Sequence, residues 1–148
     1  MHKESLGKYA AAIYRNSQSI IGHKLSGLEL KSGQYDFLYY ISKHEGITQQ
    51  ELSDGLYISK STTAKAVKNL LNSGYIRKEP DIYDKRCNRL YLSKKGLEIE
   101  PLVRTAFLEM IDIYAKDISL EEYDHTIFLL KKVLYNLCDE KNKLDTDF

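Results

Sequence analysis

The sequence lacks an apolar run of about 18 residues, the length at which a segment becomes a candidate membrane-spanning helix. Its first residues, Met-His-Lys-Glu-Ser, contain no apolar segment of the kind found in signal peptides. The two cysteines, Cys87 and Cys138, suggest no disulfide framework. These absences predict a cytoplasmic protein with no membrane partner. With 148 residues and 43% hydrophobic content, the chain is long enough to bury the core of one domain.

The sequence also lacks the patterns of common catalytic and cofactor sites. No glycine-rich segment has the strand–helix context of a phosphate-binding loop. The histidines and cysteines form no HxxxH or CxxC pair, and no nucleophile–base pair or carboxylate cluster stands out. We therefore expect no enzyme activity, no cofactor and no metal site. His44 and Glu45 could contribute to a metal site only if it were assembled in space or across a dimer, and a surface turn is the simpler interpretation.

The net charge of +1 conceals an uneven distribution. Residues 1–59 are neutral, with 6 basic and 6 acidic side chains. Residues 60–95 hold 10 basic and 3 acidic side chains, a net charge of +7, whereas residues 96–148 hold 6 basic and 12 acidic side chains, a net charge of −6. A basic middle segment is typical of a protein with one face toward phosphates.

The centre of this basic segment has the pattern of a helix. Ser59 can cap its N-terminus, and Gly74 fits the left-handed position just past its end. Ala64, Val67, Leu70 and Leu71 are expected to form one apolar stripe. Three lysines and no acidic residue lie within 59–73, a composition suited to phosphates and base edges. The opposite face of this helix carries Lys60, Ser61, Thr62, Lys65, Lys68 and Asn69.

The segments on either side complete a helix-turn-helix with a wing. Thr48 and Glu51 form a capping box that starts a short helix, and this helix is expected to end at Gly55. A tight turn then leads to Ser59. After Gly74, residues 75–79 and 89–92 are expected to be strands, joined by a polar loop with a basic tip. Such a tip could enter a minor groove.

Helices are expected at both ends of the chain. One is predicted over residues 6–28, a second over about 33–43, and a third from Ser93, with a kink or restart before Pro101. The last helix is expected to end by Asp139 and to leave a polar, frayed tail. Their apolar faces look too wide for a winged helix alone to cover, which favours a homodimer. The alternative is a larger monomeric core.

Taken together, these segments resemble the MarR family of bacterial transcriptional regulators. The resemblance is carried by Ile47–Ser53, Ile58–Leu70, Gly74–Lys78, Asp84–Arg86 and Leu90–Gly96. It implies a mainly α fold with a small β-hairpin wing, in a single domain over 1–148. The DNA-binding lobe would comprise 33–96, and the dimerisation helices 1–30 and 97–140. The family implies a homodimeric repressor, relieved by a small ligand or an oxidant, on a pseudo-palindromic DNA operator.

The resemblance also assigns roles to residues. Ser61, Thr62 and Lys65 would face base edges in the major groove, with Lys60 and Lys68 near phosphates. Arg86 would enter the minor groove with Asp84 as its brace, while Lys85 and Arg89 add charge to the wing. Thr48, Gln49 and Gln50 could donate to phosphate from a helix N-terminus, although Thr48 as a cap alone is the simpler interpretation. For Lys60 and Lys68, the alternative is solvated surface.

The effector is not identified by the sequence. Tyr9, Tyr14 and Tyr39 are weak candidates for stacking on an aromatic ligand, although for each a core or interface role is the simpler interpretation. Cys87 follows Arg86, and a nearby cation favours thiolate formation, so Cys87 is a weak redox candidate. The alternative function for the whole chain is a winged-helix module that binds protein and has lost DNA binding.

Overall fold

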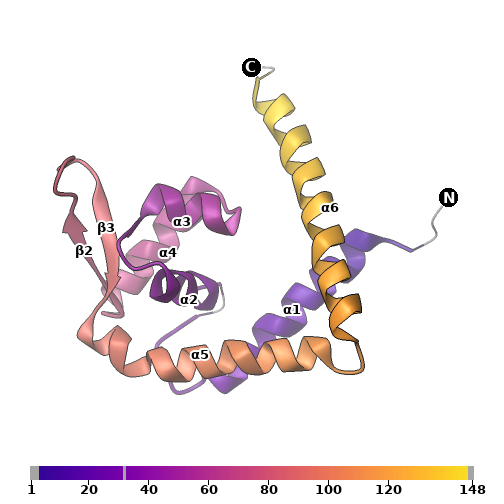
Figure 1. Cartoon of the computed structure of the whole chain (residues 1–148). Helices are drawn as coiled ribbons and strands as arrows, with labels where there is room; N and C mark the ends of the chain where they lie inside the picture. Colours follow the sequence, from indigo (N-terminus) through magenta and orange to yellow (C-terminus); the bar gives the residue numbers. More distant parts are fainter. Residues whose placement is uncertain (1–3, 32, 147–148) are drawn as a thin grey trace. The chain divides into compact units, whose positions relative to one another are not determined.

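The computed structural model of the chain describes residues 4–31 and 33–146 (Figure 1). Its helices are α1 (Leu6–Lys24), α2 (Tyr35–Lys43), α3 (Gln49–Leu56), α4 (Lys60–Asn72), α5 (Lys94–Ala115) and α6 (Leu120–Thr146). Its strands are β1 (Ile47–Thr48), β2 (Ile76–Pro80) and β3 (Asn88–Leu92). The chain divides into two compact units, one up to residue 110 and one from residue 111. This confirms a mainly α protein with a small β wing. Within the described ranges, no helix is long and apolar enough to cross a membrane.

The sheet has one strand that the sequence pattern did not predict. Its order is β1-β3-β2, and both pairs are antiparallel. Ile47 pairs with Leu90 in the short strand β1, while Arg77 pairs with Tyr91 in the wing hairpin. Gly46 precedes β1 with a φ of +88° and donates its N–H to the Leu90 carbonyl at 2.8 Å. Two residues are too few for periodicity to detect a strand.

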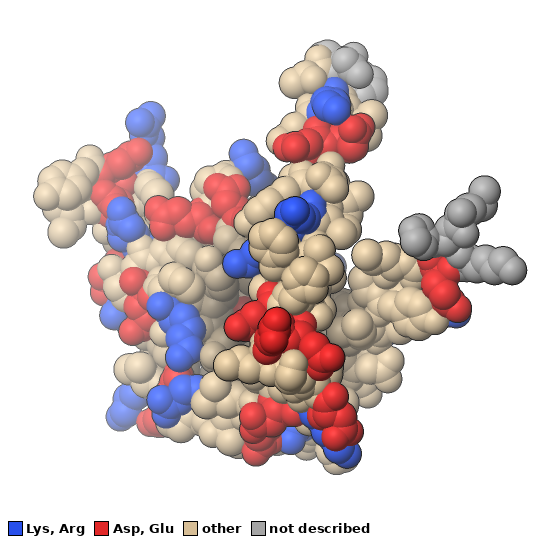
Figure 2. All heavy atoms as spheres, turned by 45° about the vertical axis from the view of Figure 1, so that its right-hand side comes forward, with Lys and Arg blue, Asp and Glu red and all other residues tan. Residues whose placement is uncertain are grey.

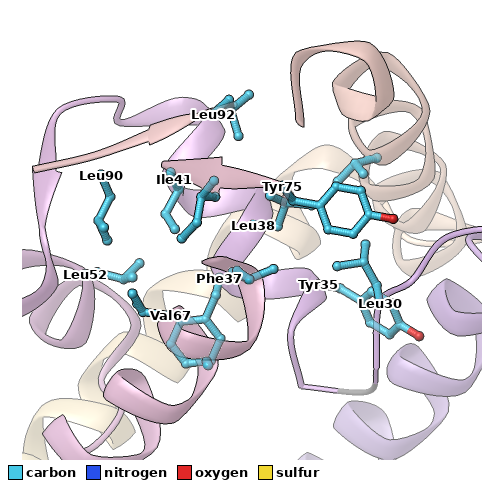
Figure 3. Close-up of a cluster of buried hydrophobic side chains, with 14 of the residues drawn as sticks. Leu30, Tyr35, Phe37, Leu38, Ile41, Leu52, Val67, Tyr75, Leu90 and Leu92 are labelled. Atoms are coloured by element: carbon cyan, nitrogen blue, oxygen red, sulfur yellow. The ribbon is translucent and has the colours of Figure 1, made fainter. Parts of the chain in front are cut away.

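The core of the first unit packs α2, α3 and α4 against the sheet (Figure 3). Ile41 from α2, Leu52 from α3 and Leu70 from α4 are fully buried. The sheet adds the buried residues Leu90 and Leu92, and Leu90 points toward Leu52 in the close-up. This packing positions α4 and the wing on one scaffold.

The junction between the wing and α5 is held by a close backbone approach. Ser93 donates its hydroxyl to the Gly74 carbonyl and accepts the Gly96 N–H at 3.0 Å. A Cβ on Gly96 would lie 2.0 Å from the Tyr75 carbonyl oxygen, so only glycine fits. Tyr75 is itself buried, and its hydroxyl accepts the backbone N–H of Glu29 at 2.9 Å.

Three helix boundaries differ from the sequence expectations. α1 ends at Lys24 rather than near residue 28, where Leu25 leaves helical geometry ahead of Gly27. α5 runs through Pro101 without a restart; Pro101 is exposed, so water can reach the carbonyl that proline leaves free. α6 continues to Thr146 rather than ending by Asp139. Good helix formers and a Glu140–Lys143 ion pair extend it.

Candidate nucleic-acid interface

The N-terminus of α3 is built by the predicted capping box. Thr48 Oγ1 accepts the Glu51 N–H at 3.1 Å, and the Thr48 N–H donates to Glu51 Oε2 at 3.4 Å. Thr48 therefore already serves as a cap, whereas Gln49 remains exposed beside it. Gln49, Gln50 and Ser53 line a small surface notch together with Lys60 from the start of α4. Ser53 already donates its hydroxyl to the Ile58 carbonyl, so the Gln49 amide and the Lys60 ammonium, both exposed, are the donors that can bind a phosphate.

The start of α4 is also capped as expected. Ser59 Oγ accepts the Thr62 N–H at 3.2 Å and lies 2.9 Å from Thr62 Oγ1. These contacts fix the first turn, from which Lys60 and Ser61 project into solvent. The N-terminal end of a helix is where a recognition helix presents side chains to base edges.

The exposed face of α4 lacks negative charge. Lys65 and Lys68 lie on this face with Ser61, and Thr62 is also exposed. The helix, from Lys60 to Asn72, contains no acidic residue. A face with cations, hydroxyls and no carboxylate has the donors that phosphates and base edges require.

The buried face of α4 differs from the predicted stripe in one position. Ala64 is exposed and so belongs to the outer face, and the expectation for it was wrong. Its place is taken by Thr63 and Ala66, which are buried with Val67 and Leu70. Spacing alone did not reveal this because Thr63, a residue type classed as polar, occupies a core position.

The wing loop is organised by Asp81. One carboxylate oxygen accepts the backbone N–H groups of Tyr83 at 2.8 Å and Asp84 at 3.0 Å, and the other accepts Arg89 Nε. The two backbone donors, followed by Arg89, lower the pKa of the Asp81 carboxyl below its ordinary value. Sequence reasoning did not identify Asp81, although an Asp directly after a proline at a strand end is a turn signal.

Arg86 extends from this loop into solvent. Its side chain is 93% exposed, and Asp84 Oδ1 accepts both its backbone N–H at 3.0 Å and its Nε at 3.3 Å. Lys85 beside it is also exposed. The loop therefore presents two cations, one of which has a carboxylate aligned behind it.

Comparisons with known proteins agree with this geometry. A MarR-family model matches residues 26–86. The uncharacterized HTH-type transcriptional regulator YybA of Bacillus subtilis is 30% identical over 84% of this chain and 83% of its own length. The chain belongs to the MarR family of transcriptional regulators. The solved MarR protein from Peptoclostridium difficile is 31% identical, with a TM-score of 0.85 over 97% of this chain and 94% of that one.

A MarR-family structure containing DNA also matches. A putative MarR-family regulator from Listeria monocytogenes, solved in complex with a 26mer DNA, is 28% identical with a TM-score of 0.84. The match covers 93% of this chain and 91% of that one. The family consists of regulators rather than enzymes, in agreement with the absence of catalytic patterns in the sequence.

Arg89 occupies a different position from the other wing cations of this MarR-family chain. Its Nη1 donates to the Gly46 carbonyl at 2.7 Å, and its Nε donates to Asp81. Through these two hydrogen bonds, Arg89 links the wing loop to the turn before β1 and so stiffens the base of the wing. A role for Arg89 as a direct DNA contact stays a prediction.

Among the described residues, the three candidate effector tyrosines each contact different neighbours, and these contacts do not join them into one site. The Tyr9 hydroxyl donates to Glu4 at 2.6 Å. Tyr39 already stacks on Phe107, with ring centroids 4.2 Å apart. For Tyr14, partial burial, followed by the charge of Asp36, raises the pKa of its hydroxyl.

Cys87 lies half-buried at the base of the loop. Its backbone N–H donates to the Asp84 carbonyl at 3.0 Å, and its thiol lies 3.9 Å from the Asn88 carbonyl oxygen. Redox sensing by Cys87 stays a prediction.

Proposed function

We propose that the chain is a sequence-specific DNA-binding regulator in which α4 reads the major groove and the wing enters the minor groove. The observation that carries this proposal is the exposed face of α4, which combines Ser61, Lys65 and Lys68 without a carboxylate. The DNA-containing structure of the Listeria relative supports it. The wing adds Arg86 as a second, independent cationic element.

The residues divide by chemistry into two roles. Ser61, Thr62 and Lys65 donate to base edges, where hydroxyl and ammonium groups discriminate base pairs. Lys60, Lys68 and Gln49 lie where donors fix the register of the helix on phosphates. In the wing, Lys85 and Arg86 meet the negative potential of a narrow minor groove. The DNA-binding lobe over 33–96 contains all of these groups.

We also propose a homodimer built from residues 1–30 and 97–140. No residue of α6 is buried within the described chain, although the helix carries many large apolar side chains. In Figure 2, uncharged side chains (tan) lie between the charged side chains of α6. The exposed apolar residues include Phe128, Leu130 and Leu137 on α6, and Tyr9, Ile13 and Ile20 on α1. Apolar surface of this extent is typical of protein–protein contact.

Sedimentation velocity tests the dimer. We expect the chain to sediment at twice its monomer mass and Phe128→Glu to shift it toward the monomer. Lys141→Glu, a charge change at an exposed position of the same helix outside residues 97–140, serves as the control. A monomer at all concentrations would contradict the dimer.

Repression relieved by a small ligand or an oxidant is the regulatory direction that we propose. A dimer bound to a pseudo-palindrome blocks other proteins from the same DNA, which represses transcription. A ligand or an oxidant that changes the separation of the two DNA-binding lobes would lower the affinity of the dimer for the operator. Operator-controlled reporter expression, with and without the protein, measures the direction.

The experiment that tests DNA binding is a selection from random duplexes at several salt concentrations. We expect enrichment of a pseudo-palindrome with half-sites about one helical turn, roughly 34 Å, apart. Absence of enrichment and of any salt-sensitive binding would contradict the proposal and favour the alternative, a protein-interaction module. The unopposed positive charge of α4 argues against that alternative.

A further inference from the structure

The wing exposes two large side chains that the proposed function does not use. Ile82 is 89% exposed and Tyr83 is 97% exposed, more than any other large hydrophobic side chain in residues 4–31 and 33–146. The two are adjacent in sequence and lie in the loop between β2 and β3 (Figure 1). Neighbouring apolar side chains held fully in water are typical of a contact surface.

The backbone of the loop that carries them is braced by hydrogen bonds. The Asp81 N–H donates to the Cys87 carbonyl at 2.8 Å, which closes the loop across its base. The Asp81 carboxylate then fixes the backbone on both sides of the tip by accepting the N–H groups of Tyr83 and Asp84. The exposure of Ile82 and Tyr83 is therefore a property of an ordered turn, which is the condition for a low-entropy contact.

The charged side chains next to Ile82 and Tyr83 indicate which kind of partner this surface binds. Lys85 and Arg86 follow within three residues of Tyr83, and both are exposed. The two carboxylates of the loop are already engaged, Asp81 by Arg89 and by backbone donors and Asp84 by Arg86. An apolar tip beside exposed cations fits a groove with anionic edges and hydrocarbon walls, and the DNA minor groove has this composition.

We propose that Ile82 and Tyr83 contact the deoxyribose walls of the minor groove next to Arg86 and supply an uncharged part of operator affinity. The proposal rests on the proposed DNA-binding function and deepens it. Arg86 contributes by displacing counterions, so its contribution falls as salt rises. The apolar pair contributes by burial, which is far less sensitive to salt. The pair also responds to groove width, which depends on sequence at positions that no side chain reads directly.

The apolar pair and Arg86 should therefore differ in how their contributions to affinity depend on salt. We expect Ile82→Ser combined with Tyr83→Ser to weaken binding to the selected operator by about 30-fold at every salt concentration, the order of magnitude that apolar side-chain burial supplies. The slope of log K against log salt should stay at its unmodified value. Arg86→Ala, by contrast, should lower both the affinity and the slope.

Two further variants serve as controls. Leu144→Ser makes a similar change at an exposed apolar residue outside the proposed dimerisation segments, and it should leave binding unchanged. Tyr83→Phe keeps the ring and removes the hydroxyl, and it should bind as the unmodified chain does. Circular dichroism confirms that each variant is folded.

The outcomes separate this inference from the function on which it rests. If the double variant binds with unmodified affinity while Arg86→Ala does not, the inference is overturned and the exposed pair belongs to a protein contact. An equal loss in Tyr83→Phe would also overturn it, because a hydroxyl contact would then replace the apolar one. If the unmodified chain itself shows no salt-sensitive DNA binding, the proposed function fails first.

Discussion

Asp84 accepts two hydrogen bonds from Arg86, one from its backbone N–H at 3.0 Å and one from its Nε at 3.3 Å. A carboxylate at the tip of a DNA-binding wing is unfavourable by charge alone, because it faces phosphates. The two bonds instead fix the direction of the guanidinium. Since an exposed ion pair of this kind contributes little to stability, its effect is on orientation.

The bracing of Arg86 by Asp84 predicts that removing this carboxylate lowers DNA affinity, the opposite of what its charge alone would suggest. Removing a negative charge next to DNA should by itself raise affinity, whereas removing the brace should lower it. We expect Asp84→Ala to weaken operator binding severalfold, measured by fluorescence anisotropy at fixed salt. Glu79→Ala, which removes an exposed carboxylate at the end of β2, is the control. Tighter binding by Asp84→Ala would show that Asp84 only repels DNA.

Two lysines of α4 are expected to differ in what they recognise. Lys65→Ala should change the preference among operator variants by roughly 1–3 kcal/mol at one base pair, because we propose that the Lys65 ammonium contacts base edges. Lys68→Ala should weaken binding to all variants to a similar degree, because phosphate contacts carry no sequence information. Titration against a panel of single-base operator variants measures both. A uniform loss for Lys65→Ala would reassign Lys65 to phosphate.

The wing should lose order in acid. The pKa of Asp81 is lowered in the folded chain by the backbone N–H groups of Tyr83 and Asp84 and by Arg89, so its stabilising contribution is present above the ordinary aspartate pKa of about 3.9. That contribution is lost as the pH falls through the lower pKa of the folded state. We expect hydrogen-exchange protection of the Tyr83 and Asp84 amides to fall in this window, after correction for the intrinsic exchange rate.

Asp81→Asn provides the control for that titration. It keeps an oxygen acceptor but removes the charge, so protection of the same two amides should be weaker at neutral pH and should no longer respond to acid. Unchanged protection in Asp81→Asn would contradict the role of Asp81 in holding the loop.

The junction between the wing and α5 requires glycine at position 96. Gly96→Ala places a Cβ 2.0 Å from the Tyr75 carbonyl oxygen, and backbone cannot move away as a flexible side chain can. We expect a loss of about 3 kcal/mol in the free energy of unfolding, measured by urea denaturation at matched protein concentration. Gly27→Ala, where nothing lies within 4 Å of the added atom, should change it by less than about 1 kcal/mol.

The sequence predicted the parts of the fold that depend on local signals. The capping box at Thr48 and the cap at Ser59 form as expected because each needs only residues three positions apart. The boundaries that failed depend on other information. Strand β1 exists because β3 pairs with it. The predicted end of α6 is too early because it follows from the polar composition, whereas good helix formers and the Glu140–Lys143 ion pair extend the helix.

The candidate interface shows the same division. The exposed face of α4 follows from helical spacing, and Ser61, Lys65 and Lys68 are exposed as expected. Thr63 in the core and Ala64 on the surface are reversed relative to the hydrophobicity of their side chains. The link from Asp81 to Arg89 could not be predicted from spacing because the two residues lie on opposite sides of a loop.

If α4 and the wing bind DNA through their cations, the affinity must depend on salt concentration. We would measure the slope of log K against log salt for the unmodified chain and for a variant in which Lys60, Lys68 and Arg86 are all alanine. We expect a steep negative slope that becomes shallower by about 0.9 for each phosphate that the variant no longer neutralises, summed over both protomers. Equal slopes for the two proteins, or no salt dependence in the unmodified chain, would contradict it.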